Sequence, residues 1–204
     1  MHFNLALTST VATALTSCVA ALPNAGKLVV GDAIEGYGVE KIQWEFDGPD
    51  GSKIHVNGTM EQVVHHMRIN YPSHNIFHTQ EEMKALHARG ELAARTDFHG
   101  APFNCNWPKC WDVGIIQGIQ YLRGLKGRPS NGPGPGNCGR VSCSYDNAIW
   151  WCNDTKQTKT LQSFSSIADG AQFIESHCVS NNGALAGQVF HPTGWNVIVR
   201  SSKC

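Results

Sequence analysis

The cysteines are the residues of this 204-residue chain whose chemistry is easiest to state. Seven of the eight follow residue 99, and Cys105 to Cys110 and Cys138 to Cys143 each enclose four residues. Structural zinc sites more often use gaps of two residues. Disulfide bonds in an oxidising compartment are therefore the favoured interpretation, with zinc as the weaker alternative. The expected disulfide set, whose pairing the sequence leaves open, is Cys105, Cys110, Cys138, Cys143, Cys152, Cys178 and Cys204.

The N-terminus indicates an oxidising compartment. The first 21 residues contain no Asp, Glu, Lys or Arg, and Val19-Ala20-Ala21 places small residues before a cleavage point at Leu22. We predict a signal peptide over residues 1–21, a secreted protein and no transmembrane anchor, because no later stretch reaches 18 apolar residues. Removal of Cys18 leaves seven cysteines, so one thiol is free or links two chains in a disulfide-bonded dimer. Cys204 is a candidate for that thiol, although a terminal cysteine can also tie down a last strand.

Residues 138–154 hold the densest group of side chains that could bind a ligand. Trp150 and Trp151 are adjacent in an expected strand, so they point to opposite faces of a sheet. One is expected in the core, and the other on the surface unless a helix or the N-terminal segment covers it. A surface tryptophan beside Arg140 and Tyr145 would bind a sugar or a partner protein. The binding hypothesis therefore names Trp150, Trp151, Arg140 and Tyr145.

The histidines are a second group of residues that could bind a ligand or change charge. His65, His66, His74, His78 and His87 fall within 23 residues. Their spacing matches no metal-binding motif, so structural or solvated histidines are favoured over a metal site, and no cofactor is expected. A third interpretation is a response to acid, because imidazoles gain charge near pH 6 and would weaken the contact between oppositely charged segments.

Secretion also makes N-glycosylation relevant. Two acceptor patterns occur, one at Asn57 in Asn57-Gly58-Thr59 and one at Asn153 in Asn153-Asp154-Thr155. The pattern is short and frequent by chance. Either site is therefore a candidate only.

Charge divides the chain that follows the signal peptide into two parts. Residues 22–98 hold 7 Lys+Arg against 11 Asp+Glu and no cysteine, whereas residues 99–204 hold 9 against 5. The net charges of −4 and +4 predict that the acidic segment docks on the cysteine-rich part, either permanently or as a pro-segment. The whole chain has zero net charge, so no nucleic-acid partner is expected.

Hydrophobic periodicity and turn signals predict the elements that position these residues. A hairpin is expected over 39–57, helices after the capping boxes that begin at Thr59 and Thr79, and a loop over 131–137. The cysteine-rich part should contain a helix over 111–125, a hairpin over 140–153, a helix over 165–178, and strands over 185–190 and 195–200. The expected fold is α+β: a disulfide-stapled, two-layer antiparallel sheet with helices on one face, preceded by a small segment of a β-hairpin and helices.

This layout, with the helix at Gln117–Gly124, the Trp150-Trp151 hairpin and the ending Trp195-Asn196-Val197-Ile198-Val199-Arg200, resembles the small secreted cysteine-rich proteins of filamentous fungi. Many of these are candidate effectors. The arrangement expected for residues 105–204 is similar to fungal killer toxins. The resemblance implies a secreted, effector-like or toxin-like protein that binds an extracellular protein or glycan. It implies no catalytic residue, because no catalytic motif is defined for this group.

An enzymatic alternative rests on Leu185-Ala186-Gly187 followed by His191-Pro192-Thr193-Gly194. These residues distantly resemble the closing histidine loop of small guanyl-specific fungal ribonucleases. That likeness implies His191 as the general acid, Glu175 as the base and Arg200 on the phosphate. The characteristic carboxylate and arginine motifs of those enzymes are absent, so a binding protein without catalytic activity is the favoured hypothesis.

Overall fold

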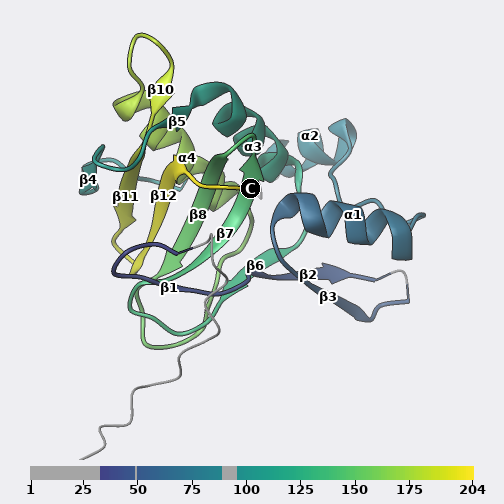
Figure 1. Ribbon diagram of the computed structural model, residues 1–204. Coiled ribbons are helices and arrows are strands. Elements are labelled where there is room, and N and C mark those ends of the chain that lie inside the picture. Colours follow the sequence, from purple (N-terminus) through teal and green to yellow (C-terminus); the bar gives the residue numbers. More distant parts are fainter. Residues whose placement is uncertain (1–32, 49, 89–95) are drawn as a thin grey trace, which may run out of the picture.

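The computed structural model describes residues 33–48, 50–88 and 96–204 of the chain (Figure 1). The predicted signal peptide and Cys18 lie outside the described residues. The described helices are α1 (Met60–Asn70), α2 (Gln80–Ala88), α3 (Asp112–Gly124) and α4 (Ser165–Cys178). The described strands are β1 (Gly38–Val39), β2 (Gln43–Asp47), β3 (Lys53–Asn57), β4 (Phe103–Asn104), β5 (Cys110–Trp111), β6 (Arg128–Asn131), β7 (Asn137–Ser144), β8 (Asn147–Asn153), β9 (Lys159–Thr160), β10 (Ala184–Leu185), β11 (Gly187–His191) and β12 (Trp195–Ser201).

The larger sheet is built around the β7–β8 hairpin. Its six strands lie in the order β1-β7-β8-β12-β11-β4, and all neighbours are antiparallel except β1, which is parallel to β7. β7 and β8 join through Tyr145 and Asp146, whose φ angles of 50° and 60° suit a tight two-residue turn. The predicted hairpin and the two predicted final strands are therefore confirmed.

The smaller sheet joins the two parts of the chain. Its order is β3-β2-β6-β9, so the predicted hairpin β2–β3 of the acidic segment pairs with β6 of the cysteine-rich part. Both predicted capping boxes are present. The N–H of Thr59 donates to Gln62 Oε1 at 3.1 Å before α1, and the N–H of Thr79 donates to Glu82 Oε2 at 2.7 Å before α2.

The main hydrophobic core takes side chains from both parts of the chain. Trp44 of β2 is fully buried and stacks on Phe164, with the ring centroids 4.2 Å apart. α1 contributes Met60, Val63 and Met67 to the same cluster, which also holds buried residues of α3, α4, β8 and β12. The acidic segment therefore shares a core with the cysteine-rich part.

Carboxylates of the acidic segment also contact the cysteine-rich part. Glu45 lies 3.3 Å from Arg128, and Glu82 lies 2.9 Å from Lys126. A third carboxylate, that of Glu40, accepts a hydrogen bond from a backbone N–H of the Gly/Pro-rich loop. The opposite charges of the two segments thus meet through ion pairs and through hydrogen bonds to backbone.

In its main features the fold class agrees with the sequence: helices and antiparallel sheets are mixed, and three disulfides join them. Two short strands, β5 and β10, form a further antiparallel pair beside the start of α3. Within the described ranges, no helix has both the length and the apolar character needed to cross a membrane.

Candidate functional site

The two tryptophans of the hairpin are both buried. Trp151 is 0% exposed in the main core, and Trp150 is 1% exposed in a second cluster with Ile34 and Ile198. Tyr37 and Trp107 pack against that second cluster. The acidic segment and a loop therefore cover Trp150, which is the alternative that the sequence left open. The sugar-binding hypothesis for Trp150 and Trp151 is corrected, because stacking on a sugar needs an exposed indole ring.

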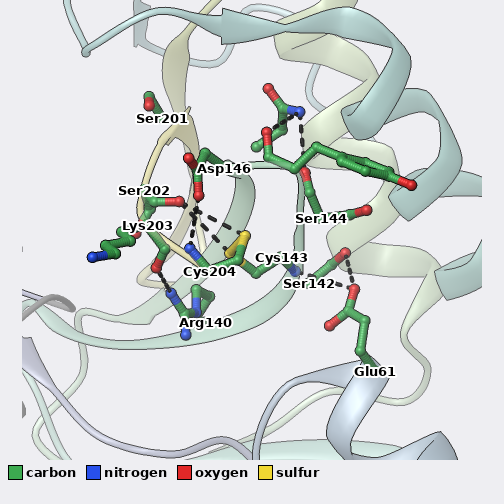
Figure 2. Close-up of a disulfide and its surroundings, with 12 residues drawn as sticks. Glu61, Arg140, Ser142, Cys143, Ser144, Asp146, Ser201, Ser202, Lys203 and Cys204 are labelled. Carbon is green, nitrogen blue, oxygen red and sulfur yellow. Dashed lines mark hydrogen bonds between the residues drawn. A yellow bond between two sulfur atoms is a disulfide. The ribbon is translucent and has the colours of Figure 1, made fainter.

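Arg140 holds the C-terminal end of the chain (Figure 2). Its Nη1 donates to the carbonyl oxygen of Lys203 at 2.8 Å, and its guanidinium carbon lies 5.7 Å from the centre of the Trp150 ring. The Cys143–Cys204 disulfide and a hydrogen bond of 3.0 Å from the N–H of Cys204 to Asp146 Oδ1 fix the same end. The structure therefore gives Arg140 a structural role beside its predicted binding role.

Glu61 of α1 joins the acidic segment to this hairpin. Its Oε1 accepts from Ser142 Oγ at 2.9 Å and from the backbone N–H of Cys143 at 3.1 Å, as the dashed lines in Figure 2 show. The two donors follow an irregularity in the β7–β8 register between Arg140 and Ser142. A carboxylate of α1 therefore ties the acidic segment to the end of β7.

Tyr145 is the predicted binding residue that the structure exposes, with 88% of its surface accessible. Its turn is fixed against α3 by Asn147. The Nδ2 of Asn147 donates to the carbonyl oxygens of Ser144 and Tyr145, and its Oδ1 accepts from the N–H of Trp111 at 2.7 Å. Gly114 allows this approach, because a Cβ there would lie 2.5 Å from Asn147 Nδ2. The hairpin turn and the start of α3 therefore form one rigid corner.

Five large hydrophobic side chains are exposed at this corner and along α3, with exposed fractions of 36% to 88%. We call them the α3 patch: Trp111, Val113, Ile116, Tyr121 and Tyr145. The exposed polar side chains of Gln117 and Gln120 lie among them on the helix. No charged residue occurs between Val113 and Leu122, so the outer side of α3 lacks the charges usual on a solvated helix face. The α3 patch holds five of the nine large hydrophobic side chains that are exposed among the described residues.

Ile116 differs from the neighbouring apolar residues of α3. Ile115, Ile119 and Leu122 are buried, but Ile116 is 36% exposed. A helix with 3.6 residues per turn cannot bury both Ile115 and Ile116 on a narrow contact. Val113, Ile116 and Tyr121, which are apolar but lie outside the buried stripe, are the sequence signal for this patch.

The disulfides use six of the seven predicted cysteines. The pairs are Cys105–Cys178, Cys138–Cys152 and Cys143–Cys204. Cys110 is the free cysteine of the described chain, and it is 5% exposed. Its Sγ lies 3.2 Å from the carbonyl oxygen of Leu185, and burial raises the pKa of its thiol to about 12. Cys110 therefore cannot form the expected disulfide-linked dimer, because a buried neutral thiol cannot reach a second chain.

We expect one protected thiol per chain if the predicted signal peptide, with Cys18, is removed. Native protein at pH 8 should leave Cys110 unmodified by an aromatic disulfide reagent over minutes, whereas denatured protein should release one equivalent of coloured thiolate. Cys110→Ala should release none in either state. Rapid modification of the native protein would contradict the buried position.

The histidines are dispersed. The described residues contain no group of three or more His, Cys, Asp or Glu side chains arranged to hold a metal ion, and the side chain of His87 lies outside what is described. His65 and His66 are exposed on α1, while burial lowers the pKa of His78. A lowered folded-state pKa means that the unfolded chain takes up the proton first, so His78 destabilises the fold as pH falls below about 6.5. The acid-response hypothesis stays a prediction.

The three residues of the ribonuclease alternative are not brought together. His191 pairs with Trp195 at the start of β12, and Arg200 lies near its end, about 17 Å along the strand. His191 stacks on Trp195, and the guanidinium of Arg200 lies 5.4 Å from the centre of the Trp107 ring. Glu175 accepts from Gln172 on its own helix. This set cannot act on one phosphate in this arrangement.

The two glycosylation candidates differ in exposure. Asn57 is exposed at the end of β3. Asn153 is 0% exposed, and its Nδ2 donates to the carbonyl oxygens of Gly132 and Gln157, both at 2.7 Å. A glycan bonded to that nitrogen is incompatible with this packing, so the predicted glycosylation of Asn153 is wrong. Glycosylation of Asn57 stays a prediction.

No protein-family model, no curated protein and no solved structure matches the chain. The resemblance to fungal cysteine-rich proteins and killer toxins therefore stays a prediction.

Proposed function

We propose that this chain is a secreted, effector-like or toxin-like protein that binds an extracellular partner protein through the α3 patch. Its scaffold is a two-layer arrangement in which helices cover one face of the larger sheet. The acidic segment stays as a permanent part, because its strands and core residues complete the fold. The protein acts by binding and not by catalysis.

The composition of the α3 patch is the observation that carries this proposal. Tryptophan and tyrosine are the residues most enriched among those that dominate binding energy in protein interfaces. Trp111 and Tyr145 are 59% and 88% exposed, and Val113 in the first turn of α3 is 63% exposed. A secreted protein that exposes this much aromatic and aliphatic surface along one helix and the turn next to its start gains from covering it.

The form of the patch favours a protein over a small ligand or a glycan. Small molecules bind in hollows, where a few polar groups surround them. Two hollows of the described structure, with volumes of about 290 and 340 Å³, are lined by other residues, and no member of the α3 patch lines either. Val113 and Ile116 also offer aliphatic surface that suits the apolar centre of a protein interface.

The chain offers a matched pair of variants that tests the proposal. Val113 on α3 and Ile69 on α1 are both 63% exposed aliphatic residues on helices. Val113→Asp should weaken retention of fluorescently labelled protein on intact cells that bind the wild type by at least about tenfold, because a charge would be buried at the interface. Ile69→Asp should leave retention unchanged.

Treatment of the cells tests the class of partner. Brief protease treatment of the cell surface should abolish retention of the wild-type protein, and glycosidase treatment should not. Equal retention of both aspartate variants, or loss of retention after glycosidase treatment alone, would contradict a protein partner at the α3 patch.

A further inference from the structure

The strand β3 forms an open edge of the smaller sheet. β3 pairs with β2 on one side, and the described residues place no strand on its other side. In Figure 1 the β2–β3 hairpin projects from the rest of the molecule, with β3 as its outer strand. Open strand edges present backbone donors and acceptors to other chains.

The register of the hairpin tells which backbone groups face outward. Gly58 N–H donates to Ile42 at one end and Gly48 N–H donates to Ser52 at the other, so the even-numbered residues of β2 form the hydrogen-bonded pairs. Ile54 and Val56 therefore direct their backbone groups toward β2. The odd-numbered residues of β3 direct theirs outward: Lys53, His55 and Asn57.

Lys53, the charged residue of this edge, does little to prevent pairing with another strand. A lysine on an edge strand commonly discourages pairing because its charge must stay in water. Lys53 is instead drawn along the sheet surface toward β2, where its ammonium contacts the carboxylates of Asp47 and Glu45. None of the outward backbone groups of Lys53, His55 or Asn57 bonds to another described residue.

We infer that β3 pairs with β3 of a second copy of this chain, antiparallel and centred on His55. In that register His55 lies opposite His55 of the other copy, and Lys53 lies opposite Asn57. All three outward residues of each strand then form hydrogen-bonded pairs, which gives six hydrogen bonds across a two-fold axis. The two smaller sheets become one continuous sheet of eight strands.

A second copy suits this edge for three reasons. The three outward residues are evenly spaced about His55, so a two-fold axis at His55 pairs all of them, as an isologous interface requires. Charge also allows it, since Lys53 meets the neutral Asn57. On the core side, Ile54 and Val56 of opposite copies become neighbours and cover each other's remaining 7% and 8% of exposed surface.

The contact area of one five-residue strand is small, so the dimer should be weak, with a dissociation constant on the order of 100 µM. Sedimentation of protein made without N-glycans, at concentrations from roughly 10 µM to 1 mM, should show a rise from monomer toward dimer mass. The amide hydrogen of His55 should exchange more slowly at the higher concentration, which a surface contact elsewhere would not cause.

Two variants at the centre of the strand separate edge pairing from other association. His55→Pro removes an outward N–H that no internal hydrogen bond uses, so it should weaken the dimer at least about tenfold while the hairpin stays intact. His55→Thr keeps the N–H and should dimerise like the wild type. Val113→Asp should also dimerise, because the α3 patch is not involved.

A protein that stays monomeric at 1 mM, or a His55→Pro variant that is folded by circular dichroism and dimerises like the wild type, would overturn the inference. If His55→Pro does not fold, the amide exchange of the wild-type protein decides: an exchange rate of His55 that is independent of concentration would also overturn it. None of these outcomes bears on the α3 patch, whose test uses different residues.

Discussion

Replacing Trp151 with alanine is expected to lower the free energy of unfolding by about 3–5 kcal/mol. Trp151 is fully buried in the main core and lies opposite Val197 of β12 in the centre of the larger sheet. Neighbouring strands fix the backbone on both sides, so the cavity left by the indole ring cannot collapse fully. Urea unfolding followed by circular dichroism measures the loss.

The same hairpin supplies the control for this substitution. Tyr145→Ala removes an aromatic ring that is 88% exposed, and it should change stability by no more than about 0.5 kcal/mol. A loss below about 1 kcal/mol for Trp151→Ala would mean that the hairpin is not packed as described.

Removing the Cys143–Cys204 disulfide should cost about 4 kcal/mol, the second large effect. The bond closes a loop with a sequence separation of 61, and the loss of chain entropy in the unfolded state grows with loop length. The double variant Cys143→Ala with Cys204→Ala should also release the C-terminal residues that Arg140 holds. Proteolysis near the C-terminus should therefore become faster.

A second disulfide in the same sheet gives the comparison. Cys138–Cys152 has a sequence separation of 14, so its removal should cost about 3 kcal/mol, less than the longer loop. Thermal unfolding of the two double alanine variants measures which disulfide contributes more to stability. A reversed order would show that packing around the sulfurs outweighs the entropy of the loops.

Local signals predicted much of this fold. The capping boxes at Thr59 and Thr79 begin helices where expected, because the side chains and backbone groups that form them lie within four residues. The β7–β8 hairpin follows from alternating residues around a polar turn. These features depend on neighbours in sequence, which a single chain displays directly.

Features that depend on distant partners were not predicted. Arg128–Asn131 contains a proline and no β-branched or aromatic residue, yet it forms β6 because β2 of the acidic segment pairs with it. Two-residue strands such as β1 have no periodicity to detect. Their existence is a consequence of tertiary packing.

In the candidate site, too, local features could be predicted and features that depend on distant residues could not. Tyr145 was found because a hairpin turn is exposed wherever the strands lie. Trp150 was placed among candidate binding residues, although Ile34 and Tyr37, more than 100 residues away in sequence, cover it. Cys110 could not be singled out as the free cysteine, because pairing depends on which sulfurs the fold brings together.

Site-specific photo-cross-linking tests most directly whether the α3 patch contacts an extracellular protein. A benzophenone amino acid placed at Val113 should produce a discrete, protease-sensitive cross-linked product on intact cells. The same probe at Ile69, which is equally exposed on α1, should produce none. Equal cross-linking from both positions, or a product from Ile69 alone, would contradict the proposed binding surface.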